Sequence, residues 1–262
     1  MIKQKIKHVW RSGINNEIIE SITKRTYIPL KIIFSAMTSY ESNPYHNFGH
    51  ALGTAETAIT IAYLQGLSMI EATLVGVGGL FHDSLRQGIA NADDELRAAL
   101  KMLSKLSDAD LALCNLQPLH RFVLRDLVVA TTITLHGKVD NPLAKIIQDA
   151  DISYMGKGPY MYLYACMGLV DEFSRQFGTP TDPISFIRDK QKLFIDHIIS
   201  LSPNKDTFFL SPGARELLQD PREVLEVILS WENRIFMLAY DLYKIDIDFD
   251  HFTKIIDHQR LL

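Results

Sequence analysis

The sequence predicts an all-α fold, a compact multi-helix bundle that forms a single domain over residues 1–262. Apolar residues recur at intervals of three and four along most of the chain, which is the spacing of one helix face. Prolines such as Pro142, Pro159 and Pro221 stand where these segments begin, and the first turn of a helix tolerates proline best. No convincing alternating strand, low-complexity linker or internal repeat favours another architecture.

The helical pattern can be followed in order along the chain. It predicts helices within residues 17–37, 51–67, 72–81, 93–106, 121–135, 141–155, 160–177, 184–201 and 221–243. Short stretches at 108–110 and 178–183 are predicted to be turns. Residues 244–252 alternate like a strand, but this segment is too short and isolated to change the fold class.

Composition limits the classes of function. Hydrophobic residues make up 47% of the chain and charged residues 22%, so a sizeable core is expected. The formal net charge of -4 leaves no broad basic surface, so a nucleic-acid partner is not expected. Cys114 and Cys166 stand in no metal or redox spacing and are expected to be buried thiols. Without a leader-like segment or an apolar stretch that spans a bilayer, we expect a cytoplasmic protein that needs no membrane.

Two histidines four residues apart, His46 and His50, occur in the stretch NPYHNFGHALGTAE at the predicted start of a helix. At this spacing both side chains lie on one face of a helix, so both can point into one cavity. A metal site follows if further ligands come from elsewhere in the chain. Taken alone, the pair is equally consistent with one core histidine and one capping or surface histidine.

Two further segments offer such ligands. His82 and Asp83 stand together at the end of an apolar segment whose paired glycines permit close helix packing. Asp149 and Asp151 follow another apolar run, and one of them can complete a mixed set of imidazole and carboxylate ligands. Such a set suits Zn, Fe, Mn or Mg.

At this point the residues resemble a known family signature. His50, the doublet His82 and Asp83, and Asp151 reproduce the H…HD…D pattern of the HD-domain metal-dependent phosphohydrolase superfamily, whose fold is all-helical. Within it, the chain resembles the catalytic domain of class I cyclic-nucleotide phosphodiesterases. The matching segments, in the same order, are YHNFGHA (45–51), HDSLRQGIAN (82–91), ATTITLH (130–136), ADIS (150–153), EFSRQFG (172–178) and QKLFID (191–196). The resemblance implies a catalytic core at about 40–200, with N- and C-terminal helices packed around it.

The resemblance also implies a role for each matching residue. Two divalent cations are expected, with Zn, Mn, Mg and Fe as candidates, and the first is bound by His50, His82, Asp83 and Asp151. Asp83 is expected to bridge to the second, more hydrated cation. His46 is expected to be the general acid, and His136 to lie near the metals without binding them. Independently of the resemblance, Asp149 is interpreted as an acceptor of N–H groups or as a residue that supports the ligands, rather than as a ligand itself.

The residues that bind substrate follow from the same resemblance. Gln191 and Phe194 match the positions that hydrogen-bond and stack on the base. Without the family pattern, they would be interpreted as a surface amide and a core aromatic residue. Arg86 stands where the family has a histidine, and its guanidinium is expected to bind a phosphate of the substrate.

Other departures from the family pattern fall mostly around the second metal. Thr132 replaces the aspartate of ATDM, and Tyr154 and Met155 replace the residues NP that follow ADIS. Nothing in residues 92–129 resembles the LENHH stretch of the phosphodiesterases. The first metal site is therefore better supported than the second.

The expected function is hydrolysis of a small-molecule phosphoester, most specifically the opening of a 3′,5′-cyclic nucleotide to the 5′-monophosphate. The cations activate water and neutralise the phosphoryl oxygens, while His46 protonates the leaving oxygen. Three alternatives stay open: a nucleotide phosphomonoesterase, a di-iron oxygenase on the same fold, and a catalytically inactive domain that binds a nucleotide or a partner. The apolar faces of the terminal segments also leave a homo-oligomer open.

Overall fold

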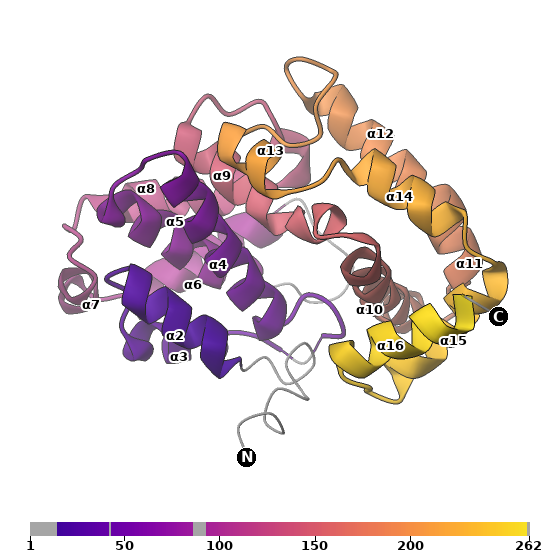
Figure 1. The fold of residues 1–262 in the computed structure, drawn as a ribbon. Helices are drawn as coiled ribbons and strands as arrows, with labels where there is room; N and C mark the ends of the chain where they lie inside the picture. Colours follow the sequence, from indigo (N-terminus) through magenta and orange to yellow (C-terminus); the bar gives the residue numbers. More distant parts are fainter. Residues whose placement is uncertain (1–14, 42, 86–92, 261–262) are drawn as a thin grey trace.

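The computed structural model describes residues 15–41, 43–85 and 93–260. Within these ranges all regular structure is helical and no strand occurs, so the predicted all-α class is confirmed (Figure 1). No helix in the same ranges combines the length and the apolar character that crossing a bilayer requires.

The helices form two groups that follow the order of the chain (Figure 1). The first group contains α2 (Asn16–Arg25), α3 (Leu30–Met37), α4 (Phe48–Leu64), α5 (Met69–Phe81), α6 (Asp94–Lys105), α7 (Asp108–Leu113), α8 (His120–Ala130) and α9 (Pro142–Asp151). The second group contains α10 (Pro159–Phe177), α11 (Pro183–Ser185), α12 (Gln191–Leu201), α14 (Pro221–Leu229), α15 (Asn233–Lys244) and α16 (Phe249–Arg260). Helix α13 (Pro212–Leu217) returns to pack on α4 and α9.

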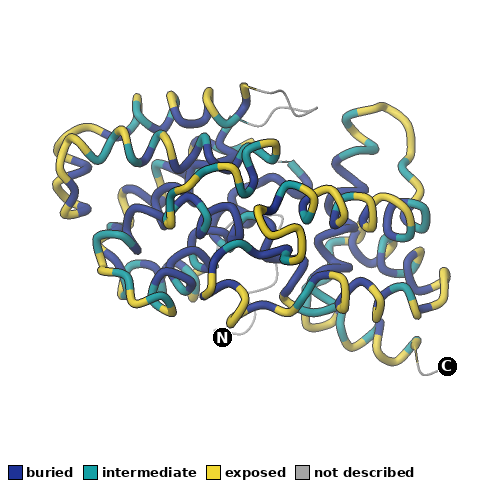
Figure 2. The backbone as a smooth tube through the Cα atoms, turned by 90° about the horizontal axis from the view of Figure 1, so that it is seen from above, coloured by how far each residue is buried: buried dark blue, intermediate teal, exposed yellow. Residues whose placement is uncertain are grey.

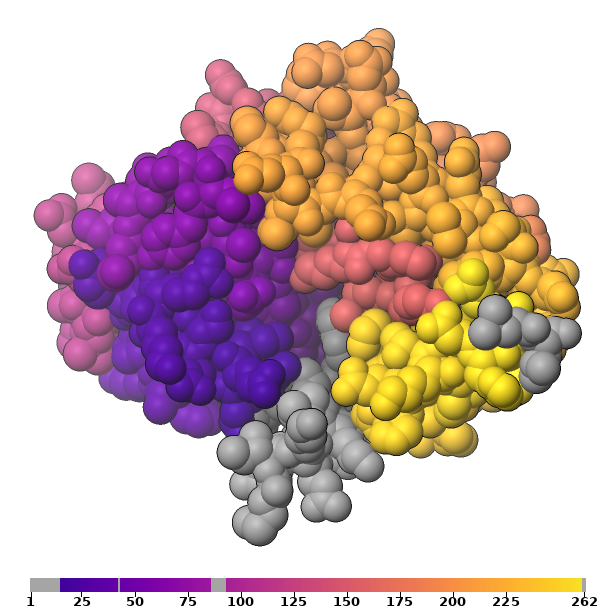
Figure 3. Space-filling view, viewed as in Figure 1, coloured from indigo at the N-terminus to yellow at the C-terminus, as the bar shows by residue number. Residues whose placement is uncertain are grey.

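Three short helical segments connect these elements. The 3-10 turns η2 (Ile133–Leu135) and η3 (Ser153–Gly156) follow α8 and α9, and the π-helical turn η4 (Phe186–Lys190) joins α11 to α12. The space-filling view shows the middle of the chain, in salmon, between the violet first group and the orange and yellow second group (Figure 3). The connection from α9 to α10 therefore lies where the two groups meet.

Helices α4 and α5 form the centre of the first group. Both are buried around most of their circumference, as expected for helices that are apolar on nearly all sides; Figure 2 shows such buried backbone in dark blue. Where the two helices cross, a Cβ atom on Gly79 would lie 2.8 Å from the Cα atom of Ala55, so glycine is required for this approach. The crossing brings the beginning of α4 beside the end of α5.

Some local predictions differ from the structure. The periodic segment 17–37 is two helices, because the chain is extended at Thr26 and at Pro29, which precedes α3. Residues 108–110, predicted to be a turn, are the first turn of α7, which begins there because Ser107 and Asp110 form a capping box. The alternating residues 244–252 belong to the end of α15, the start of α16 and their connection.

Buried apolar side chains from both groups form one connected core. Cys114 and Cys166 are buried free thiols, as predicted. The division into a catalytic core at 40–200 and surrounding terminal helices stays a prediction.

Candidate active site

Four side chains from three helices converge beside the crossing of α4 and α5. His50 lies in the first turn of α4, His82 caps the end of α5, Asp83 follows it, and Asp151 is the last residue of α9. Each offers one ligand atom, and these atoms all lie within 4.8 Å of one another. The structure thus brings together the four residues that the resemblance assigned to the first metal, here called the metal cluster.

The ligand atoms of the metal cluster face one point. The Nε2 atoms of His50 and His82 are 3.2 Å apart, and each lies 3.0 Å from Oδ1 of Asp151. Oδ2 of Asp83 lies 3.0 Å from Nε2 of His82. The other ring nitrogen of His82 donates to the Gly79 carbonyl oxygen at 2.8 Å, which leaves Nε2 to face the cluster.

Charge explains why this buried cluster fits a cation. Burial lowers the pKa of His50. Burial also opposes charge on His82, but the carboxylates of Asp83 and Asp151 outweigh it and raise the pKa of His82 well above its usual value. Burial opposes charge on Asp151 as well, yet the adjacent imidazoles hold its pKa below the usual range. Two imidazoles and two carboxylates therefore share a site that a divalent cation such as Zn, Fe or Mn would neutralise.

His46 lies beside the metal cluster but has a different partner. Its Nδ1 atom is 2.5 Å from Oε1 of Glu172, a buried residue of α10. The other oxygen of Glu172 accepts the backbone N–H groups of Tyr45 and His46 at 3.1 and 2.9 Å. Glu172 therefore holds both the ring and the backbone of His46, with Nδ1–H of the ring as the donor.

The prediction that His46 and His50 share one helix face is wrong. Helix α4 begins at Phe48, because the side chain of Asn47 caps it by accepting the N–H groups of Gly49 and His50. His46 precedes this cap and lies outside the helix. The two rings nevertheless stay close, with centroids 5.7 Å apart.

A cavity of about 800 Å³ lies beside both His46 and the metal cluster. Its wall includes Asp83 and Asp151 of the metal cluster, His46, and Gln191 and Phe194 of α12. Residues from the two helix groups thus line one space. Its volume lies within the range of about 300–1,000 Å³ that is usual for small-molecule sites.

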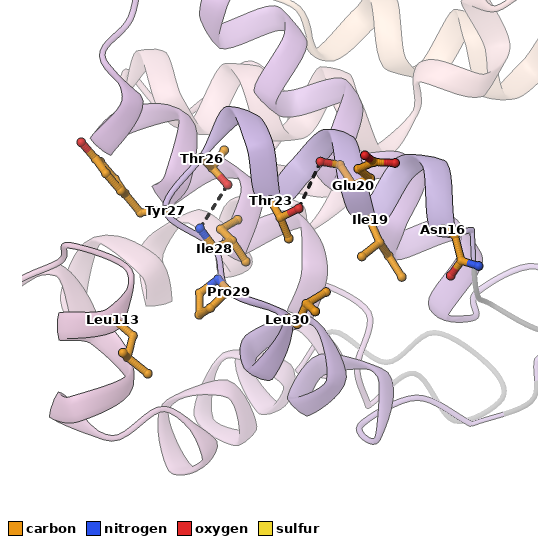
Figure 4. A pocket seen from close by; sticks show the side chains of 10 residues that line it. All are labelled: Asn16, Ile19, Glu20, Thr23, Thr26, Tyr27, Ile28, Pro29, Leu30 and Leu113. Carbon is orange, nitrogen blue, oxygen red and sulfur yellow. Dashed lines mark hydrogen bonds between the residues drawn. The ribbon is translucent and has the colours of Figure 1, made fainter.

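A second cavity of about 480 Å³ lies between α2, the α2–α3 connection and the end of α7 (Figure 4). Its wall is mostly apolar and includes Ile19, Ile28, Leu30 and Leu113. Among the described residues that line it, Glu20 is the only carboxylate, and it pairs with Lys24 at 2.5 Å. The described part of this wall therefore lacks the grouped imidazoles and carboxylates that distinguish the first cavity.

Comparison with known proteins adds to this geometry. No family model and no curated protein matches the chain. The solved phosphodiesterase domain of a rhodopsin phosphodiesterase from Salpingoeca rosetta is similar over 88% of this chain and 90% of that one, with a TM-score of 0.59 and 15% identity. A second structure, the phosphodiesterase domain of the RhoPDE fusion protein of the same choanoflagellate, has a TM-score of 0.56 and 15% identity over 93% and 90%. The chain has the fold of a phosphodiesterase domain.

In this phosphodiesterase-like fold, the two residues expected to bind the base lie on the cavity wall. Gln191 is buried rather than on the surface, and its Oε1 atom accepts the hydroxyl of Tyr162 at 3.1 Å. Gln191 and Phe194 are one helical turn apart on α12, directly after the π-helical turn η4. Such turns interrupt the helical register and are frequent at functional sites.

The remaining predicted residues have separate outcomes. Asp149 is fully buried and accepts the N–H groups of Leu210 and Ser211 at 2.8 and 2.6 Å, which confirms its interpretation as an acceptor. His136 faces the Phe208 carbonyl oxygen at 3.4 Å, and burial lowers its pKa to about 4. Its role near the metals stays a prediction. Arg86 lies outside the described residues.

Sequence reasoning missed two carboxylates of this candidate site. Glu172 begins the segment EFSRQFG that carried part of the resemblance, so a signal for it was present. Glu95, in the first turn of α6, lines the cavity together with Asp83. Nothing in the sequence around Glu95 indicated that it lines this cavity, because the placement depends on how α6 packs on α8.

Proposed function

We propose that the protein is a metal-dependent phosphodiesterase that opens 3′,5′-cyclic nucleotides to 5′-monophosphates. The observation that carries this proposal is the shared cavity, which is bordered by the metal cluster and by His46. Phosphoester hydrolysis requires metal ions that activate water and a proton donor for the leaving group, and metal ligands beside a positioned histidine can provide both. The phosphodiesterase-like fold supports the same reaction class.

The metal cluster would hold the first divalent cation. A second, more hydrated cation would be held by Asp83 together with Glu95, since both carboxylates line the same cavity. Cations bound here would lower the pKa of a coordinated water and neutralise the charge that builds up on the phosphoryl oxygens. Glu95 would take the place of the glutamate in the family's LENHH stretch, which residues 92–129 do not reproduce.

His46 would protonate the leaving oxygen. Because Nδ1–H donates to Glu172, the Nε2 atom is left to carry the transferred proton into the cavity. A carboxylate that fixes the ring orientation and stabilises the imidazolium form is the usual support of a histidine acid. Proton donation to an alkoxide leaving group is worth about 10² to 10⁴ in rate.

The base of the nucleotide would lie against α12. Phe194 offers a ring face for stacking. The Tyr162 hydroxyl orients the amide of Gln191 by donating to Oε1, so the amide hydrogens are left to donate to an acceptor on the base. Both residues would therefore set the orientation of the substrate relative to the metal cluster.

The test is hydrolysis by metal-stripped protein reconstituted in turn with Mn, Mg, Zn and Fe. Substrates are cyclic AMP, cyclic GMP, bis(p-nitrophenyl) phosphate and p-nitrophenyl phosphate. The variant is Asp83→Asn, and the matched control is Asp171→Asn, which alters another buried aspartate that pairs with Arg175 and Lys244. We expect metal-dependent diester cleavage that Asp83→Asn abolishes and Asp171→Asn retains.

Other outcomes would contradict the proposal. Cleavage of the monoester alone would indicate a nucleotide phosphomonoesterase. If a protein shown to contain metal hydrolysed none of the four substrates, the result would indicate an oxygenase or a binding domain. Diester cleavage that survives metal removal would mean that the metal cluster is not the reaction centre.

A further inference from the structure

Lys101 of α6 binds the backbone next to Asp83 of the metal cluster. Its Nζ atom donates to two carbonyl oxygens, that of Ser39 at 2.9 Å and that of Ser84 at 3.2 Å. Ser39 follows α3 and Ser84 follows α5, and both residues are buried. One ammonium group therefore lies just beyond the C-terminal ends of two helices, where the helix dipoles favour a cation.

A second contact joins the same two backbone segments. The hydroxyl of Tyr40, the residue after Ser39, accepts the backbone N–H of Asp83 at 3.3 Å. The end of α3 is thus linked to the turn after α5 twice, once through Tyr40 and once through Lys101. Asp83 is held at its N–H group, and Ser84 is held at its carbonyl oxygen. Because the backbone is fixed on both sides of Asp83, the direction of its carboxylate is fixed as well.

The helix that carries Lys101 also carries Glu95. Glu95 lies in the first turn of α6, and Lys101 lies six residues further along. Asp83 and Glu95 line the same cavity. The contact between Lys101 and Ser84 is therefore a direct link between the helix that presents Glu95 and the turn that presents Asp83.

Lys105, one turn after Lys101 on α6, makes contacts of a different kind. Its Nζ atom donates to the carbonyl oxygen of Ser35 at 3.3 Å and to the hydroxyl of Thr38 at 3.0 Å. Ser35 belongs to α3 and Thr38 caps it. Lys105 thus holds α6 against α3, whereas Lys101 also reaches the turn after α5.

We propose that Lys101 is a positioning residue that holds the Asp83 carboxylate and the helix of Glu95 in the arrangement that a second cation requires. The inference rests on the proposed function, because it takes Asp83 and Glu95 as ligands of that cation. Lys101 is not among the described residues that line the cavity, so it acts through the Ser84 carbonyl oxygen. Partners that orient a metal ligand directly contribute about 10- to 100-fold to metal affinity, and a residue that acts one step further away contributes less.

The test uses the full-length protein, first stripped of metal, with three variants. Lys101→Met removes the ammonium group and keeps an unbranched side chain, and Lys101→Arg restores a cation. The matched control is Lys105→Met, which removes the cation one turn further along α6. Electron paramagnetic resonance of free Mn²⁺ gives the affinity of each site. Nuclear magnetic resonance gives the hydrogen exchange of the Asp83 N–H without metal, and urea unfolding verifies that each variant is folded.

We expect Lys101→Met to weaken the weaker of two Mn²⁺ sites by about three- to ten-fold and to change the tighter site by less than about two-fold. Exchange of the Asp83 N–H should become faster, because one of the two links to α3 is lost. Lys101→Arg should recover part of the affinity, and Lys105→Met should match the unaltered protein at Asp83. An unchanged weaker site in Lys101→Met, an equal loss in Lys105→Met, or equal weakening of both sites would overturn the positioning role.

The exchange measurement separates this inference from the proposed function. If the proposed function fails, the unaltered protein will bind fewer than two Mn²⁺ ions, or will hydrolyse no phosphoester with both bound. Exchange at Asp83 is measured without metal, so it tests Lys101 in either case. Faster exchange in Lys101→Met alone supports the positioning of Asp83 by Lys101, and equal exchange in Lys101→Met and Lys105→Met overturns it.

Discussion

His46 and His50 are four residues apart in the sequence, yet they belong to two regions of the site that are built differently. His50 meets one imidazole, that of His82 at the end of α5, and the carboxylates of Asp83 and Asp151 within the metal cluster. His46 precedes α4 and is held by Glu172, a single carboxylate from α10. Asn47 lies between them and caps the start of α4, so that His50 is inside the helix and His46 is outside it. The comparison teaches that the start of an element, more than the spacing of a pair, decides which partners each side chain meets.

The largest expected effect on activity comes from a change in the metal cluster, here called the metal region in contrast to the region of His46. His50→Ala should remove most of the bound metal and lower kcat/KM by about 10³-fold or more, because the loss of cation charge costs several kcal/mol in the transition state. Metal content by mass spectrometry and rates on bis(p-nitrophenyl) phosphate check this. Full metal content in the variant would show that His50 is not a ligand.

His46→Ala is the matched change in the other region. We expect kcat to fall by about 10² to 10⁴, the usual worth of a general acid, while the metal content stays that of the unaltered protein. Both quantities are measured on the same preparation. If His46→Ala lost metal as His50→Ala does, the two regions would not be distinct.

Glu172→Gln should have a smaller effect in the same region as His46. We expect kcat to fall by about ten-fold or more, because the ring loses the carboxylate that fixes it, with metal content unchanged. Gln176→Ala is the control, since Gln176 only donates to Oε1 of Glu172 at 3.3 Å. Equal rates in Glu172→Gln and the unaltered protein would remove Glu172 from the catalytic arrangement.

A change in packing should affect the metal region through the backbone. Gly79→Ala should lower the free energy of unfolding by about 1–3 kcal/mol and weaken Mn²⁺ binding, because its Cβ would press on the backbone of Ala55. Gly78→Ala is the control, since its Cβ would meet the flexible end of Ile147. Urea unfolding and Mn²⁺ titration measure both effects. Equal behaviour of the two variants would contradict the close crossing of α4 and α5.

The smallest expected effect concerns His136. Its pKa is about 4 in the folded protein, below the ordinary value of 6.5, so the unfolded chain binds more protons between these values. Stability should therefore fall as the pH drops from 6.5 towards 4, by about 2 kcal/mol or less. His136→Gln should remove this fall in denaturation curves at several pH values. Reduced Mn²⁺ affinity in the variant would instead support the predicted place of His136 near the metals.

Sequence reasoning found the metal region more completely than the region of His46. The all-α class followed from apolar spacing, and the metal cluster followed from residues whose types and order match a family signature. Glu172 lies within a matching segment, but the sequence indicated no role for it. Its contact with His46, 126 positions away, arises only when α10 packs against the start of α4.

Glu95 and the two phenylalanines of α10 that line the cavity lie beyond what the sequence could indicate. Phe173 and Phe177 are spaced like any apolar helix face, which ordinarily faces the core. That they face a cavity depends on η4 and α12 standing opposite α10, and that placement is tertiary. The boundary between α2 and α3 was missed for a local reason, since the periodic pattern continues on both sides of Pro29.

The most direct measurement is the fate of cyclic AMP incubated with the Mn²⁺-loaded protein in oxygen-18-enriched water, followed by ³¹P nuclear magnetic resonance. Attack of water on phosphorus at the metal cluster should give 5′-AMP with one oxygen-18 atom on phosphorus, and no product after metal removal. Unchanged cyclic AMP with a metal-loaded protein, or the same product without metal, would contradict the assignment of His50, His82, Asp83 and Asp151 to a hydrolytic metal centre.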